Sequence, residues 1–186
     1  MGTSMLAIVQ ARVGSTRLPG KVLKKIHGKT LIEILFARLQ GSKKIDKAIL
    51  ATSTSQENDL LVKMVENLQI DVFRGSEHDV LSRFFHAAQE YSASDVVRIT
   101  GDCPIIDAEL VDRVIEHYLE SDMDYVSNNQ PPTYPDGLDT EVFSFAALKA
   151  AHEQASQEFD REHVTPFMRT GEQFRRMNYA NNIDLS

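Results

Sequence analysis

The chain has 186 residues and a formal net charge of −7, with 42% hydrophobic and 25% charged residues. These values are typical of an ordinary globular protein, and we expect residues 1–186 to form a single domain that buries its own core. The acidic balance argues against general binding to nucleic acid or anionic lipid. An anionic ligand would therefore need a local basic site.

Cysteine usage and hydropathy limit the location of the protein. Cys103 is the single cysteine, so no internal disulfide is possible and nothing indicates an oxidising compartment. No apolar run approaches the length of a membrane span, and no signal-peptide pattern is present. We therefore expect a cytoplasmic protein.

Strands and helices alternate along the first two thirds of the chain. The pattern predicts strands over residues 6–9, 47–52, 70–73, 95–99 and 125–127, and helices over 30–40, 58–68, 79–91 and 107–119. Thr30 is the expected N-cap of the first helix. The predicted strands are continuous apolar runs. This pattern predicts an α/β fold with a mainly parallel sheet and helices on both faces.

The last third is less regular. Prolines in residues 128–135 predict a loop. A strand is expected over 140–143, helices over 145–154 and 161–168, and a late strand over 174–179.

Residues 10–21, QARVGSTRLPGK, follow the first strand and contain two Arg, one Lys, two hydroxyl side chains, two Gly and one Pro. Cations and free backbone N–H groups at the end of a buried strand suit an oligophosphate. The alternative is a solvated basic loop. A Walker loop is excluded, because five residues separate Gly14 from Gly20 and Val22 follows Lys21.

Three charged residues follow or lie near the ends of predicted strands, although ninety positions separate the first from the last. They are Arg12, Arg74 and Asp102. In parallel α/β sheets, ligands bind at the carboxyl ends of the strands. We therefore expect these side chains to share one crevice.

Four ordered motifs resemble a known family: ARVGSTRLPGK at 11–21, VFRGS at 72–76, RITGDCP at 98–104 and YPDGLD at 134–139. They are similar to the cytidylyltransferases that activate acidic sugars, and most similar to the branch of spore coat polysaccharide biosynthesis protein F. The resemblance implies a Rossmann-like nucleotidyltransferase fold. It also implies transfer of CMP from CTP to a sugar, with release of pyrophosphate, in surface or spore-coat polysaccharide biosynthesis.

The resemblance also assigns roles to residues. The nucleotide-binding residues that it implies are Arg12, Ser15, Arg17, Lys21, Arg74 and Thr100. Lys21 and Asp102 are the implied catalytic residues, and Asp102 the implied Mg²⁺ ligand. On residue chemistry alone, Asp102 could instead cap a turn and Lys21 could be an ordinary surface lysine. Thr100 departs from the glutamine common in related enzymes, which weakens the assignment of cytosine over another base.

Two further clusters are candidates for binding the sugar. Asp136, Asp139 and Glu141 would bind sugar hydroxyls or a second cation if they face the crevice, and are otherwise turn formers and a solvated strand face. Arg161 and His163 would bind an acidic acceptor, or belong to the exposed first turn of a helix.

Two other functions remain open at this point. One is a glycosyltransferase-like protein that binds a finished nucleotide sugar, and the other is a non-catalytic nucleotide-binding module. The first loop favours the transferase, because a triphosphate makes better use of three or more cations than a diphosphate does. A homodimer is a further expectation.

Related chains usually continue to a second metal-binding Asp near the motif VDxPED, which is not found here. We therefore expect a domain truncated at its C-terminal end that binds CTP but turns over slowly.

Overall fold

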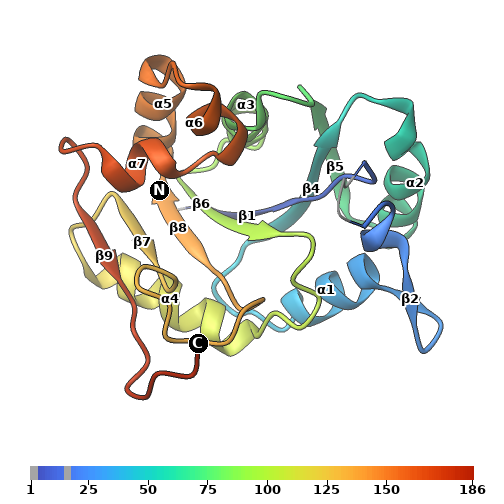
Figure 1. The fold of residues 1–186 in the computed structure, drawn as a ribbon, viewed down its shortest axis with the longest axis horizontal. Coiled ribbons are helices and arrows are strands. Elements are labelled where there is room, and N and C mark those ends of the chain that lie inside the picture. Colours follow the sequence, from blue (N-terminus) through green and yellow to red (C-terminus); the bar gives the residue numbers. More distant parts are fainter. Residues whose placement is uncertain (1–3, 15–17) are drawn as a thin grey trace.

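The computed structural model describes residues 4–14 and 18–186, and a seven-stranded sheet runs through its middle (Figure 1). β1 (Met5–Gln10) lies near the centre of the sheet, between β4 (Lys47–Ser53) and β6 (Asp95–Thr100), and is parallel to both. β5 (Asp71–Gly75) adds a further parallel strand beyond β4. These four parallel strands confirm the predicted mainly parallel sheet.

The sheet becomes mixed on the other side of β6. β8 (Glu141–Ser144) runs antiparallel to β6, and β7 (Tyr125–Ser127) runs antiparallel to β8. β9 (Arg176–Asn178) closes this edge in parallel to β7. The strand order is therefore β5-β4-β1-β6-β8-β7-β9.

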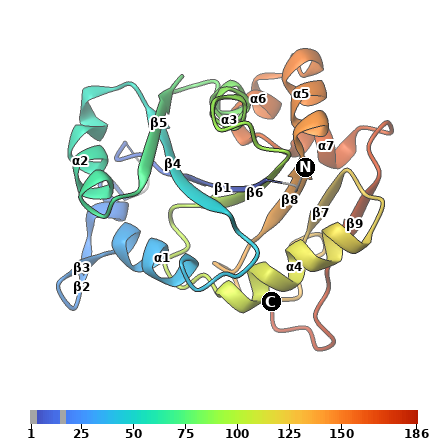
Figure 2. The same ribbon diagram turned by 180° about the vertical axis from the view of Figure 1, so that it is seen from behind.

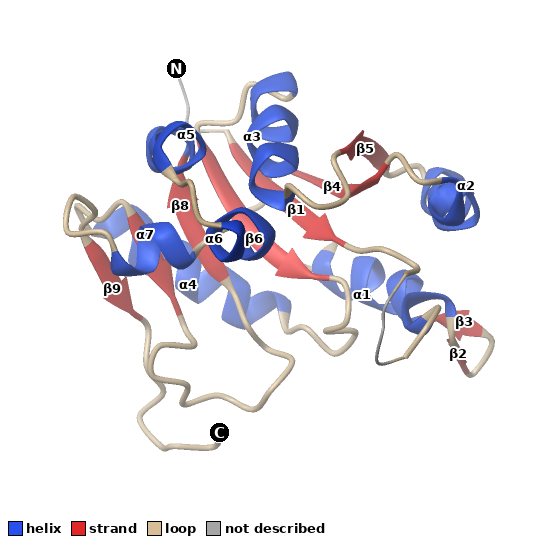
Figure 3. Cartoon of the chain, turned by 45° about the horizontal axis from the view of Figure 1, so that its top comes forward, coloured by secondary structure: helices blue, strands red, loops and turns tan. Residues whose placement is uncertain are grey.

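Helices cover both faces of the sheet, as predicted (Figures 2 and 3). One apolar cluster joins the sheet to α1 (Leu31–Leu39), α2 (Asp59–Asn67) and α4 (Ala108–Glu120). The opposite cluster joins it to α3 (Val80–Glu90), α5 (Phe145–Gln154) and α7 (Pro166–Thr170). α6 (Glu158–His163) lies beside α3 and buries no residue of its own.

The alternation of side chains along β1 explains this three-layer arrangement. Ala7 and Val9 belong to the cluster under α1 and α4, whereas Leu6 and Ile8 belong to the cluster under α3 and α5. All four are at most 2% exposed. Successive side chains of a strand point to opposite faces, so a strand buried on both faces must be apolar throughout.

Side-chain caps set the start of the main helices. Thr30 and Glu33 form a reciprocal capping box at α1, which confirms the predicted cap. Asp79, Asp107 and Ser144 accept backbone N–H bonds at the starts of α3, α4 and α5. Each cap satisfies an amide that the helix itself leaves unpaired.

The predicted helix over 161–168 is wrong. The chain forms two short helices, α6 and α7, separated at Val164, whose φ is 71°. Pro166 occupies the first position of α7, where its missing N–H costs nothing. The short hairpin of β2 (Lys25–Ile26) and β3 (Lys29–Thr30), which follows the 3₁₀ turn Lys21–Leu23, was not predicted.

Among the described residues, no helix is both long enough and apolar enough to cross a membrane.

Candidate active site

The carboxyl ends of β1 and β6 lie side by side, since Gln10 is paired with Thr100. The backbone N–H of Gly101 donates to the Gln10 carbonyl at 2.8 Å. A Cβ at Gly101 would lie 2.6 Å from the Cβ of Ala11 and 2.9 Å from the Gln10 oxygen. The segments that follow β1 and β6 can therefore approach this closely only because residue 101 is a glycine.

Lys21 and Asp102 meet at this edge. The loop folds back where the N–H of Gly20 donates to the Val13 carbonyl at 2.9 Å, and Gly20 has a φ of 68°. Lys21 then places its Nζ 2.5 Å from Oδ2 of Asp102. Burial alone would raise the pKa of Asp102, but the hydrogen bond and positive charge of Lys21 outweigh it. The pKa therefore lies below the usual value, and Asp102 is an ionised carboxylate.

A pocket of about 730 Å³ opens over this edge, and we call it the first pocket. Its lining includes five cations: Arg12, Lys21, Arg83, Arg98 and Arg161. Three of them lie close to carboxylates of the same lining. Arg12 is 3.6 Å from Glu77, Lys21 contacts Asp102, and Arg161 contacts Asp79.

Arg83 and Arg98 are the cations of this lining that the sequence analysis missed, and Arg83 is the more buried of the two. Arg83 is 3% exposed and forms no ion pair with the described residues. Its Nη1 donates to the Ser76 carbonyl at 2.7 Å, whereas its buried Nε has no partner in the described part of the chain. Burial and the charge of Arg12 lower its pKa to about 10. The signal was available, because residue 83 falls on the buried face of α3, three positions after Val80.

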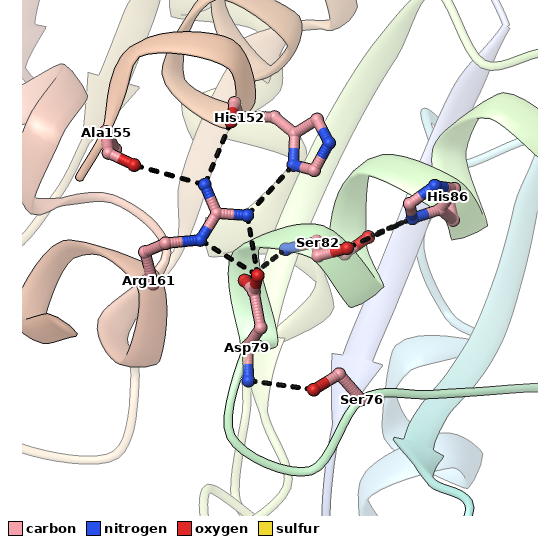
Figure 4. A network of polar contacts seen from close by, with 7 residues as sticks. All are labelled: Ser76, Asp79, Ser82, His86, His152, Ala155 and Arg161. Atoms are coloured by element: carbon pink, nitrogen blue, oxygen red, sulfur yellow. Dashed lines mark hydrogen bonds and ion pairs between the residues drawn. The ribbon is translucent and has the colours of Figure 1, made fainter. Parts of the chain in front are cut away.

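Arg161 lines the pocket, but its guanidinium is already engaged (Figure 4). Its Nε and Nη2 donate to Oδ2 of Asp79 at 2.8 and 2.6 Å. Its Nη1 donates to the carbonyls of His152 and Ala155 at 2.9 and 3.1 Å. Arg161 therefore fastens α6 to the start of α3 and to the end of α5. His163, at the end of α6, also reaches the pocket lining.

Arg74 does not line the pocket, so the expectation that it shares the crevice is corrected. Its Nη1 is 2.8 Å from Oδ1 of Asp59, and its Nε and Nη2 donate to the carbonyls of Ser53 and Ser55. These bonds hold the guanidinium against the turn that follows β4. Thr100 does line the pocket, with its hydroxyl 3.0 Å from the Cys103 sulfur.

The acidic cluster is also placed outside this lining. Glu141 is 2% exposed, and its carboxylate is fully paired: Tyr125 and Thr165 donate to its Oε1 at 2.5 and 2.8 Å and Arg98 pairs with its Oε2. Glu141 therefore neither lines the crevice nor lies on a solvated strand face, so both alternatives are wrong for this residue. Asp139 is half-buried, and burial and the carboxylates of Glu141 and Asp136 raise its pKa.

Ser15 and Arg17 lie outside the described residues, so their predicted contacts stay predictions.

This edge offers a divalent cation one carboxylate ligand, Asp102. The described residues contain no group of three or more potential metal ligands. The Asp102 side chain is 43% exposed at the pocket, which leaves it accessible as one carboxylate ligand. Mg²⁺ is commonly bound by one or two carboxylates, with water and substrate phosphates completing its shell.

The three-layer fold, with a pocket at the strand ends, is the Rossmann-like fold of nucleotidyltransferases. A family model described as cytidylyltransferase matches residues 6–185, and the chain belongs to this family. The recognition made from the motifs is thereby confirmed.

Individual relatives match most of this chain. An uncharacterized protein of Methanocaldococcus jannaschii is 44% identical over 88% of this chain and 66% of its own length. Spore coat polysaccharide biosynthesis protein SpsF of Bacillus subtilis is 36% identical over 89% of this chain and 70% of its own. The structure of a cytidylyltransferase from Leptospira borgpetersenii, 30% identical, matches all of this chain and 79% of that one with a TM-score of 0.95. The chain thus spans 66% of the length of the Methanocaldococcus jannaschii protein and 70% of the length of SpsF.

Proposed function

We propose that this chain, or the protein to which it belongs, transfers CMP from CTP to a sugar hydroxyl and releases pyrophosphate. The observation that carries the proposal is the first pocket. In a chain of the cytidylyltransferase family, it gathers Arg12, Lys21, Arg83 and Asp102 at the adjoining ends of β1 and β6. Cations of this kind bind the oxygens of a triphosphate.

In the proposed reaction, the acceptor hydroxyl attacks the α-phosphorus of CTP. An oxygen–phosphorus bond forms, the bond from the α-phosphorus to the bridging oxygen of pyrophosphate breaks, and the hydroxyl proton passes to solvent water. The protein acts mainly by positioning and electrostatics. Arg12 and Arg83 hold phosphate oxygens, and the Lys21 ammonium, oriented by Asp102, neutralises charge on the phosphates.

Asp102 is the residue that would hold a divalent cation, which we propose to be Mg²⁺. When bound, such a cation polarises the phosphate and offsets negative charge on the departing pyrophosphate. Lys21 contacts the same carboxylate and lowers its pKa, so Asp102 stays ionised.

The test is pyrophosphate release under single-turnover conditions, with each of the four NTPs and a panel of neutral and acidic sugars. We expect release from CTP that depends on a sugar, and a loss of about 100-fold or more in Lys21→Ala if its charge supports the transition state. Arg113→Ala serves as a control, because Arg113 lies on α4 across the sheet and outside the first pocket. If no pyrophosphate is released, cleavage of a nucleotide sugar supplied in place of the NTP would favour the glycosyltransferase alternative instead.

A further inference from the structure

Asn58 is a buried polar residue for which the proposed reaction has no direct use. It is 1% exposed, it ends the 3₁₀ turn Gln56–Asn58 and it immediately precedes α2. An Asn at this position usually accepts a backbone N–H from the first turn of the helix. Here the side chain makes no such bond to the described helix, and its hydrogen bonds go to other parts of the chain.

The Asn58 side chain joins two strand ends. Its Oδ1 accepts the backbone N–H of Val13, in the loop after β1, at 2.9 Å. Its Nδ2 donates to Oγ of Ser53, at the end of β4, at 2.8 Å. A backbone N–H can only donate, so the Val13 bond requires the amide oxygen on the side of the loop. Both ends of the amide are therefore used, one of them on the loop.

Val13 is the point at which the basic loop closes. Its carbonyl accepts the N–H of Gly20 at 2.9 Å, while its own N–H is held by Asn58. Arg12 directly precedes Val13 and Lys21 directly follows Gly20, and both cations line the first pocket. Asn58 itself is not among the described lining residues. The bond to Val13 therefore fixes the backbone from which two pocket cations extend, without contact to a ligand.

The turn that carries Asn58 is itself held in place. Arg74 donates through Nε and Nη2 to the carbonyls of Ser53 and Ser55, and its Nη1 is 2.8 Å from Oδ1 of Asp59. The backbone N–H of Asn58 donates to the Ser55 carbonyl at 3.0 Å. A side chain supported in this way keeps its partner in one place, which is what the positioning of a binding loop requires.

Building on the proposed function, we propose that Asn58 is a positioning residue for the triphosphate. It holds the loop at Val13, so that Arg12 and Lys21 are in place before the phosphate oxygens arrive. Arg74 acts through Asn58, by fixing the turn over residues 53–59. The benefit is in affinity, because a site that is already ordered loses less conformational entropy when it binds its ligand.

The test compares Asn58→Leu with a matched control, Asn128→Leu. Asn128 is also 1% exposed, its Oδ1 accepts the backbone N–H of Thr140 at 2.8 Å, and its Nδ2 donates to the Leu138 carbonyl at 2.9 Å. Both substitutions therefore remove one accepted and one donated hydrogen bond from a buried amide. The bonds of Asn128 stay within residues 128–140, which are absent from the described lining of the first pocket.

Calorimetric titration measures the affinity for CTP, and competition with CTP measures the affinity for cytidine, which has no phosphate. We expect Asn58→Leu to weaken CTP binding by about tenfold and cytidine binding by less than about twofold, because only the phosphate contacts depend on the loop. Asn128→Leu should leave both affinities within about twofold of the wild type. In an Arg12→Ala background, Asn58→Leu should weaken CTP binding by less than about threefold, because part of what Asn58 positions is already gone.

The outcomes separate the two proposals. If the wild type does not bind CTP, the proposed function fails, and the positioning role with it. If the wild type binds CTP, the positioning role alone is overturned by any of three results. These are an unchanged CTP affinity in Asn58→Leu, an equal loss for cytidine or in Asn128→Leu, and an undiminished effect in the Arg12→Ala background. If Asn58→Leu does not fold, Asn58→Ala and Asn128→Ala replace the pair under the same criteria, because alanine leaves room for water at the freed polar groups.

Discussion

Arg83 is unusual at the scale of single residues, because buried charges in proteins are normally paired. The residue is 3% exposed, yet a single backbone carbonyl is the partner of its guanidinium among the described residues. The neighbouring charge of Arg12 disfavours its charged form further. A phosphate in the first pocket would supply the missing anion, and this explains why a cation is kept at such a position.

The first prediction concerns Arg83→Met. The affinity for CTP should fall by about 10- to 100-fold, because a charge-assisted contact is lost. The free energy of unfolding should fall by only about 1 kcal/mol, because one hydrogen bond to the Ser76 carbonyl disappears and the methionine fills the space. Calorimetric titration and denaturant unfolding measure the two quantities. A large loss of stability with unchanged CTP affinity would assign Arg83 to folding instead.

Glu141 is the opposite case, a buried charge whose partners are all present. Burial would raise its pKa, but the charge of Arg98 and the hydroxyl donors of Tyr125 and Thr165 lower it below the usual 4.5. A carboxylate with a lowered folded-state pKa stabilises the fold above its unfolded pKa. That contribution is lost as the pH falls through the folded-state value.

We therefore predict that Glu141→Gln loses about 3–5 kcal/mol of folding free energy at pH 7, because Arg98 is left as an uncompensated buried charge. The difference from the wild type should narrow as the pH falls below 4.5, where the wild-type contribution declines. Urea unfolding between pH 7 and pH 3.5 measures this. Thr165→Val is the matched control, because it removes one hydrogen bond to Glu141 and leaves the charge. A difference independent of pH would contradict the ionised pair.

At the scale of elements, α6 is held to the domain by polar contacts. It buries none of its own residues, and Arg161 joins it to Asp79 at the start of α3 and to the end of α5. Because Asp79 also caps α3 through the Ser82 N–H, one carboxylate fixes both elements (Figure 4). α6 supplies lining residues to the first pocket, so this contact sets the shape of the site.

The corresponding prediction is that Arg161→Ala loosens α6 while the sheet stays folded. Hydrogen exchange of amides in residues 158–163 should accelerate by about tenfold or more, since a contact of this type contributes about 1.5–3 kcal/mol. A double-mutant cycle with Asp79→Ala should show a coupling energy of about 0.5–3 kcal/mol. Glu162→Ala, on the same helix, is the control. Unchanged exchange in Arg161→Ala would show that other contacts hold α6.

The elements that sequence predicts well are those whose burial is periodic. The apolar runs of β1, β4 and β6 and the stripes of α1, α3 and α4 agree with the structure to within about two residues. The region around Pro166 was missed because two short helices joined at Val164 preserve the spacing of a single helix in the sequence. The break lies in the backbone of Val164, whose φ is 71°, and the apolar spacing does not mark it.

At the scale of the whole molecule, the parallel sheet explains why part of the site was predictable. Arg12 and Asp102 follow neighbouring strands, so topology alone brings them together, and Lys21 reaches them through its loop. The same reasoning was wrong for Arg74, because β5 lies two strands from β1 and the Asp59 carboxylate binds its guanidinium. Arg98 was not found, since nothing local in the sequence distinguishes it from an ordinary arginine.

The central claim is that the edge shared by β1 and β6 binds CTP through cations and through an Asp102 that holds a divalent ion. Calorimetric titration of CTP, with and without Mg²⁺, tests it most directly. We predict that Mg²⁺ tightens CTP binding to the wild type, that Arg12→Ala weakens binding by about 10- to 100-fold, and that Asp102→Asn abolishes the Mg²⁺-dependent tightening. Unchanged affinity in Arg12→Ala, together with full Mg²⁺ dependence in Asp102→Asn, would contradict the account.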